Sequence, residues 1–171
     1  MRSFALAPMS TGLRVLTWIC FLIPAIELAG ALATPAPVRT LLFGVFVFIA
    51  LVYASVWFAW RPLRFEVDGE GLRIVWPIRW RLVPVGALID ARLITSAEFR
   101  SEFGWGMRVG AGGLWGGFGW LKTRSVTFSM WVSRTDRFVI VRLADDKPLL
   151  LTPDHPEGFV EAIDRVRRSA P

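Results

Sequence analysis

Two long apolar stretches in the first third of the chain constrain its fold more than any other feature. Between Val15 and Trp60 the only charged residues are Glu27 and Arg39. The stretches cover about residues 14–33 and about residues 40–60, and each comes close to the roughly 20 residues that a helix needs to cross a bilayer. The sequence therefore predicts two membrane-spanning helices, a prediction that the 54% content of hydrophobic residues supports.

The segment between the two stretches, residues 34–38, contains two prolines and suits a tight connection. Tryptophans at the end of the second stretch are followed at once by Arg61, which is the pattern of a helix leaving the membrane. Charged residues become frequent beyond this point. We therefore expect a transmembrane hairpin in residues 1–61 and a separate folded unit in residues 62–171.

The distribution of arginines predicts the orientation of this hairpin. Positive charge is denser on both flanks of the apolar stretches than in the connection, where only Arg39 occurs. The flanking arginines are Arg2, Arg14, Arg61, Arg64 and Arg73. Because cytoplasmic flanks carry the excess of Lys and Arg, we expect both termini and residues 62–171 to lie on the cytoplasmic side of the inner membrane.

The first apolar stretch and its one acidic residue, Glu27, each allow two interpretations. Arg14, a short apolar core and the small residues of 31–33 also resemble a cleavable signal peptide. Glu27 is a carboxyl within an apolar helix. Its side chain is either protonated or turned toward the interface, or it is an intramembrane polar contact for another subunit or protein.

The remainder of the chain alternates between apolar and polar residues as strands do, most strictly over residues 125–133. Beyond residue 153, Phe159 and Ile163 share one face of an amphipathic helix. Asp154 and Glu157 have the spacing of an N-terminal capping box. The fold class predicted is α+β: the two-helix transmembrane hairpin, then an antiparallel sheet or barrel of about seven strands, then one C-terminal capping helix. The predicted strands are 65–68, 72–76, 79–83, 88–94, 125–133, 138–141 and 148–151.

Four segments of this β-rich unit resemble a known family. They are residues 67–72 (VDGEGL), the basic and apolar strand that reaches Pro84, the glycine-rich residues 112–119, and residues 151–159 (LTPDHPEGF). In these segments the chain is similar to the bacterial pleckstrin-homology (PH) domain family of membrane-anchored proteins, over about Phe65 to Val166. The resemblance implies a PH-like barrel that acts in interaction, scaffolding or assembly at a membrane, and it implies no catalytic site.

The glycine-rich segment also carries the candidate contact residues. Large aromatic and basic side chains recur through it, and they either dip into the membrane interface and contact head groups, or tuck beneath the sheet or into a self-association contact. The candidates for partner or membrane contact are Trp105, Arg108, Trp115, Phe118, Trp120, Lys122 and Arg124.

Several function classes find little support in the sequence. Residues 116–123 approach a phosphate-binding loop, but Leu121 stands where its second glycine is required and the next element alternates as a strand. One histidine, His155, and one cysteine, Cys20, do not form a zinc site or a nucleophilic triad. The net charge of +6 is dispersed among acidic residues, unlike a nucleic-acid-binding run. We therefore expect no catalysis, cofactor, metal or nucleic acid.

The sequence thus predicts a non-catalytic, membrane-anchored interaction or assembly module that meets lipid and a protein partner or a second copy. The alternative is a protein that binds or senses lipid head groups through the glycine-rich segment and its basic neighbours.

Overall fold

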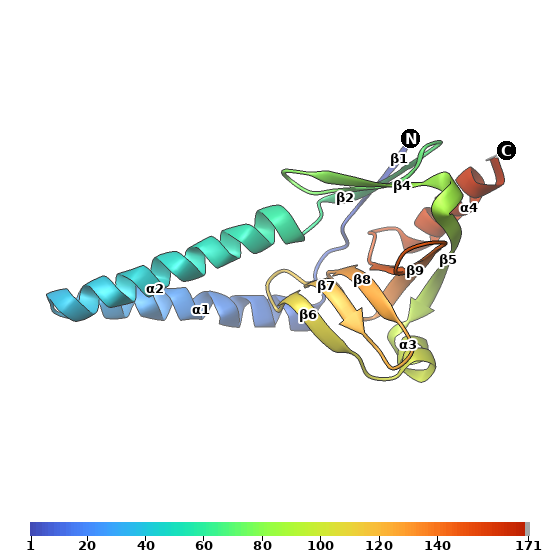
Figure 1. The fold of residues 1–171 in the computed structure, drawn as a ribbon. Coiled ribbons are helices and arrows are strands. Elements are labelled where there is room, and N and C mark those ends of the chain that lie inside the picture. The colour runs from blue at the N-terminus through green and yellow to red at the C-terminus, as the bar shows by residue number, and fades with distance from the viewer. Residues whose placement is uncertain (170–171) are drawn as a thin grey trace.

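The computed structural model describes residues 1–169 and arranges them as a long helical hairpin attached to a β-rich region (Figure 1). The helices are α1 (Thr11–Ala33), α2 (Ala36–Ser55), which continues as one π-helical turn η1 (Val56–Trp60), α3 (Ser96–Phe103) and α4 (Pro156–Ser169), with a short 3₁₀ turn η2 (Val85–Ala87). The strands are β1 (Arg2–Ala5), β2 (Arg64–Asp68), β3 (Gly71–Val75), β4 (Trp80–Pro84), β5 (Leu88–Thr95), β6 (Met107–Gly112), β7 (Gly117–Lys122), β8 (Thr127–Val132), β9 (Arg137–Leu143) and β10 (Leu149–Leu151).

The two apolar stretches form α1 and α2, with only Thr34 and Pro35 between them. Pro35 precedes the first turn of α2, a position that suits its fixed backbone angle. Most apolar side chains of both helices are exposed: no residue of α2 is buried, and the buried residues of α1 are Leu13, Thr17 and Ala31. Two helices long and apolar enough to cross a membrane are therefore present, as the sequence predicts.

The strands form two sheets. The first has the order β1-β2-β3-β4, and the second has the order β5-β9-β10-β8-β7-β6. All neighbours are antiparallel except β10 and β8, which run parallel. Phe4 pairs with Phe65, so the N-terminal strand belongs to the first sheet.

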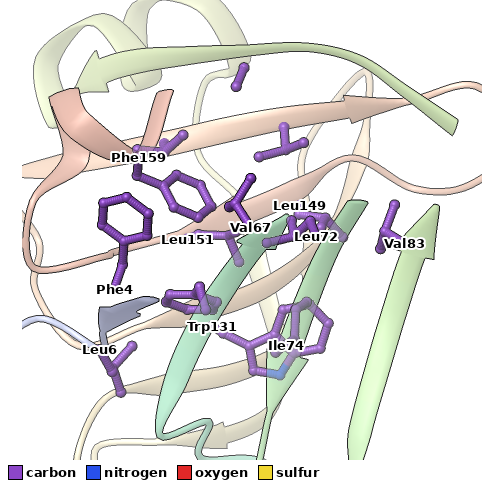
Figure 2. Packing of buried hydrophobic residues seen from close by; sticks show 14 of the residues in the cluster. Phe4, Leu6, Val67, Leu72, Ile74, Val83, Trp131, Leu149, Leu151 and Phe159 are labelled. Carbon is purple, nitrogen blue, oxygen red and sulfur yellow. The ribbon is translucent and has the colours of Figure 1, made fainter. Parts of the chain in front are cut away.

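The core lies between the two sheets and α4 (Figure 2). Phe159 of α4 is fully buried and lies with its ring centroid 5.3 Å from that of Phe4 and 5.9 Å from that of Phe65. Trp76 of the segment after β3 packs at 5.4 Å against Trp131 of β8 and so joins the two sheets. A smaller apolar cluster on the outer face of the second sheet is covered by α3.

Each of the seven predicted strands is present, with bounds that differ by at most two residues from those predicted, and the C-terminal helix is present as well. The strand count is wrong, however, because β1, β6 and β7 raise it to ten. Of the two predicted alternatives, a sheet or a barrel, the closed barrel is not found: across residues 1–169 the hydrogen-bonded strands form two separate sheets that do not close. The resemblance to the PH fold stays a prediction.

The predicted capping box at the start of the last helix does not form as expected. The Asp154 carboxylate accepts a hydrogen bond from the neighbouring His155 N–H, and Glu157 forms an ion pair with Arg137 of β9. A capping box is instead found at α3, where the Thr95 hydroxyl accepts from the Glu98 N–H and the Glu98 carboxylate accepts from the Thr95 N–H.

Candidate functional site at the base of the helix pair

The β6–β7 hairpin meets the helix pair where α1 begins and α2 ends (Figure 1). We call this contact the junction: it comprises the β6–β7 hairpin together with Leu16, Thr17, Phe21, Tyr53, Trp57 and Trp60. The glycine-rich segment forms these two strands and their turn, residues 113–116, in place of a long loop.

Thr17 of α1 is the polar centre of the junction. Its side chain is buried, and its hydroxyl lies 2.8 Å from the Leu13 carbonyl and 3.0 Å from the Gly113 carbonyl, to either of which it can donate. The same oxygen accepts from the Trp115 N–H at 3.1 Å. One threonine therefore ties the turn of the β-hairpin to the helix, and a buried polar group of this kind is costly to leave unpaired.

Trp115 fills the space between the helices. Its ring centroid lies 4.9 Å from that of Trp57, 5.8 Å from that of Phe21 and 6.4 Å from that of Tyr53. The Tyr53 hydroxyl in turn donates to the Cys20 carbonyl at 2.7 Å and links α2 to α1. Trp115 has a φ of +58°, a left-handed conformation that costs a side chain roughly 1–2 kcal/mol. The aromatic contacts offset that cost.

Two paired glycines allow Trp60, the last residue of η1, to approach the hairpin. Gly110 of β6 lies opposite Gly119 of β7, and a Cβ on either would come within 3.2 to 3.3 Å of Trp60 Cζ3. Both have a positive φ, and either Cβ would also lie 2.4 Å from a backbone oxygen. The glycines are therefore required by the close approach of the strands and Trp60.

A second hairpin, β3–β4, contacts the same end of α2. The Trp76 Nε1–H donates to the Trp60 carbonyl at 3.0 Å, and Arg79 Nη2 donates to the Ala59 carbonyl at 2.8 Å. These bonds satisfy carbonyls that a helix end leaves without partners. Residues 76–80 were not among the predicted contact residues, although tryptophans and arginines beside a proline turn gave a readable signal.

Arg61, directly after η1, has an unusual environment. Its guanidinium carbon lies 4.5 Å from the Trp57 ring centroid, and burial lowers the pKa of this guanidinium. Within the described part of the chain it forms no ion pair, and its Nε is buried without a hydrogen-bond partner.

The structure divides the seven predicted contact residues into separate groups. Trp115 lies in the junction, and Phe118 is completely buried in the core, which leaves it no surface for a partner. The others lie along the hairpin or at its opposite end, where Met107 pairs with Lys122. β6 has six residues at about 3.3 Å each, so roughly 17 Å separates the two ends of the hairpin. Those remaining residues are Trp105, Arg108, Trp120, Lys122 and Arg124.

Two of these distal residues line a cavity. Trp105 is 80% exposed, and Arg100 of α3 lies with its guanidinium carbon 4.5 Å from the Trp105 ring centroid. Arg108 lies across Gly117, with Nη1 3.8 Å from where a Cβ of that glycine would stand. Together they border a cavity of about 430 Å³ over Met130, Val132 and Leu150 on the outer face of the second sheet.

Trp120 is 44% exposed and lies 5.6 Å from the Lys147 ammonium. Lys122 and Arg124 are exposed near the turn between β7 and β8.

Glu27 is half-buried in α1, and among residues 1–169 no ion pair or hydrogen bond of its carboxyl is present. This placement leaves the predicted intramembrane role of Glu27 untested. No group of three His, Cys, Asp or Glu side chains within residues 1–169 could hold a metal ion.

Comparison of the chain with family models, curated proteins and solved structures gave no significant match.

Proposed function

We propose that this protein is a non-catalytic binding module anchored in the cytoplasmic membrane by α1 and α2, with its β-rich region held at the cytoplasmic surface. The observation that carries this proposal is the junction. A flexible tether needs no contact between anchor and domain, whereas here Thr17 and Trp115 fix the domain against the helix pair.

The dimensions and surface of the helix pair support a transmembrane role. The α2–η1 helix, Ala36–Trp60, has 25 residues, which extend about 37 Å at 1.5 Å per residue. This exceeds the hydrocarbon thickness of about 30 Å, so Trp57 and Trp60 fall near the interface, where tryptophan is enriched. Only 11% and 6% of the most apolar windows of the two helices are buried, whereas the core helix of a soluble protein is largely covered.

Contacts of the N-terminal segment support retention of α1. The Ala7 N–H donates to the Thr152 carbonyl at 2.9 Å, and the Ser133 hydroxyl donates to the Ala7 carbonyl at 2.5 Å. Cleavage after Ala33 would remove these contacts and the edge strand β1. β1 and α4 both lie at the end of the helix pair that carries the arginine-rich flanks (Figure 1), which supports a cytoplasmic position for both.

The surface we assign to a protein partner is the edge formed by β6 and the adjoining Trp105 cavity. β6 ends the second sheet, so its outer backbone groups lack a neighbouring strand. Met107 and Val109 are 65% and 45% exposed. An open edge strand accepts a partner strand. Among the described residues, Arg100 and Arg108 have no carboxylate partner, and they favour an acidic one.

Site-specific photocrosslinking in native membranes tests this assignment. A photoreactive amino acid replaces Val109 on the β6 edge, and a control variant carries it at Glu161, which is also exposed but lies on α4 and not on a strand edge. We expect one reproducible adduct, with a partner or a second copy, from position 109 and none from position 161. Equal adduct patterns at both positions, or no adduct at 109, contradict the assignment.

A second candidate function, recognition of lipid head groups, is favoured by a specific observation. Arg61 is partly desolvated beside the membrane end of α2 without an anionic partner in the described chain. A guanidinium in this position is suited to a phosphate supplied by lipid.

A further inference from the structure

The turn between β3 and β4, residues 76–79, is held beside the last turn of the α2–η1 helix. Two hydrogen bonds fix it there, from Trp76 to the Trp60 carbonyl and from Arg79 to the Ala59 carbonyl. A third, from the Trp76 N–H to the Arg79 carbonyl at 2.8 Å, closes the turn. The turn therefore lies at the same depth relative to a membrane as the last turn of the α2–η1 helix.

The side chains at the end of this hairpin are large, apolar and exposed. Ile78 is 69% exposed and Trp80 is 63% exposed, and Phe58 in the last turn of the helix is 48% exposed. Isolated exposed apolar residues are ordinary on protein surfaces. Here, however, the hairpin end lies on the side of the β-rich region from which the helices extend (Figure 1).

The charges beside the turn are positive and are not neutralised by carboxylates of the described chain. The Arg79 guanidinium lies 4.7 Å from the Trp76 ring centroid and Arg61 lies over Trp57. Elsewhere on the β-rich region many arginines are paired with acids, for example Arg81 with Asp146. The buried, unpartnered Nε of Arg61 lacks an acceptor that a phosphate oxygen can supply.

We propose that the β3–β4 turn is a second membrane contact, in which Ile78 and Trp80 enter the interfacial layer and Arg61 and Arg79 bind the phosphates of anionic phospholipids. The inference rests on the proposed membrane span of α1 and α2. It adds that the β-rich region meets the bilayer at two places, the α1–α2 helix pair and the β3–β4 turn. Two contacts fix the tilt of the β-rich region against the membrane surface. Tryptophan favours the interface, and arginines near an anionic leaflet add affinity.

Depth-dependent quenching tests the apolar part of the proposal. The full chain with Cys20→Ala receives one cysteine, labelled with an environment-sensitive fluorophore, in nanodiscs whose lipids are spin-labelled either near the glycerol backbone (the shallow label) or near the end of the acyl chain (the deep label). The reporter variant is Ile78→Cys, the matched control is Ile89→Cys, also exposed (43%) but on β5, and Val47→Cys reports on the middle of α2.

We expect quenching of position 78 by the shallow label, quenching of position 47 by the deep label, and no quenching of position 89 by either. Quenching at 47 with position 78 as unquenched as 89 overturns the inference and leaves the proposed function standing. No quenching at position 47 overturns the span, and the inference with it.

A lipid titration tests the charged part. We compare the double variant Arg61→Gln, Arg79→Gln with Arg124→Gln, which changes an exposed arginine near the distal turn. The substitutions leave the hydrogen bond from Trp76 Nε1–H to the Trp60 carbonyl in place, and this bond still holds the hairpin beside the helix end.

In the double variant, the anionic lipid fraction that gives half-maximal quenching of the label at position 78 rises. We expect a shift of about fivefold or more, whereas Arg124→Gln shifts it less than about twofold. The same dependence on anionic lipid in both variants overturns the head-group assignment. A dependence that disappears on adding inorganic phosphate overturns the assignment to lipid.

Discussion

Removal of the Trp115 side chain is the sharpest perturbation of the junction. Trp115→Ala deletes three aromatic contacts, to Trp57, Phe21 and Tyr53. Full deletion of a core tryptophan costs about 3–5 kcal/mol, and Trp115 is only half-buried. We therefore expect the docked junction to lose about 2–3 kcal/mol, since aromatic pairs add about 0.5–1.5 kcal/mol each beyond burial.

Hydrogen exchange in nanodiscs measures this loss directly. When a segment opens and closes rapidly, its exchange follows the population of the open state. A loss of about 2–3 kcal/mol raises that population roughly 30- to 150-fold, so amides of residues 113–118 should lose protection by that factor. Trp105→Ala changes an 80% exposed tryptophan just before the same hairpin and should leave the protection unchanged.

A polar substitution gives an independent check of the same contact. Thr17→Val preserves shape but leaves the Trp115 N–H without its acceptor, at a cost of about 1–3 kcal/mol. The matched control is Thr40→Val, because Thr40 is exposed and bonds only within its own helix. If Trp115→Ala and Thr17→Val leave protection of residues 113–118 as high as their controls do, the helix pair and the hairpin are not coupled.

Two further predictions concern the β-rich region. Gly110→Ala places a Cβ 2.4 Å from the Phe118 carbonyl oxygen at a φ of +131° and should destabilise the protein by about 2–3 kcal/mol in thermal unfolding. The control Gly112→Ala, on the same strand, places a Cβ that meets nothing within 4 Å and should change stability by less than about 0.5 kcal/mol. Equal effects of the two substitutions would contradict the packing at Trp60. The hydrogen bond from Arg142 holds the pKa of Asp90 below its usual value, so the pair stabilises the fold above the usual carboxyl pKa of about 3.9 and loses that contribution as the pH falls through the folded-state pKa. Arg142→Gln should therefore lower the denaturation midpoint slightly at pH 7 and match the parent chain at the acid end, and a difference that persists there would contradict this assignment.

The features that sequence reasoning recovered are those encoded locally. Long apolar runs gave the two helices, and strict alternation gave β8 at residues 127–132. The helix α3 was missed although Thr95 and Glu98 have the capping-box spacing that the structure uses. The start of α3 could therefore have been predicted from this capping-box spacing.

Other features depend on partners that are distant in the sequence. β1 has only four residues, and it is a strand because β2 lies beside it. β6 and β7 contain glycines that ordinarily disfavour strands, and their positive φ values make sense only with Trp60 packed against them. Likewise, Trp115 was a candidate by type, but its partners Thr17 and Trp57 follow from the way the chain folds back.

The central claim is that α1 and α2 cross the membrane and leave the β-rich region on the cytoplasmic side. The most direct test is the labelling of single cysteines with a membrane-impermeant maleimide, in intact and in permeabilised spheroplasts that express Cys20→Ala variants. Ala36→Cys reports on the connection between the helices, and Ser101→Cys reports on exposed α3. We predict that the thiol introduced at position 36 is labelled in intact spheroplasts and that the thiol introduced at position 101 is labelled only after permeabilisation. Labelling of both positions from the same side would contradict it.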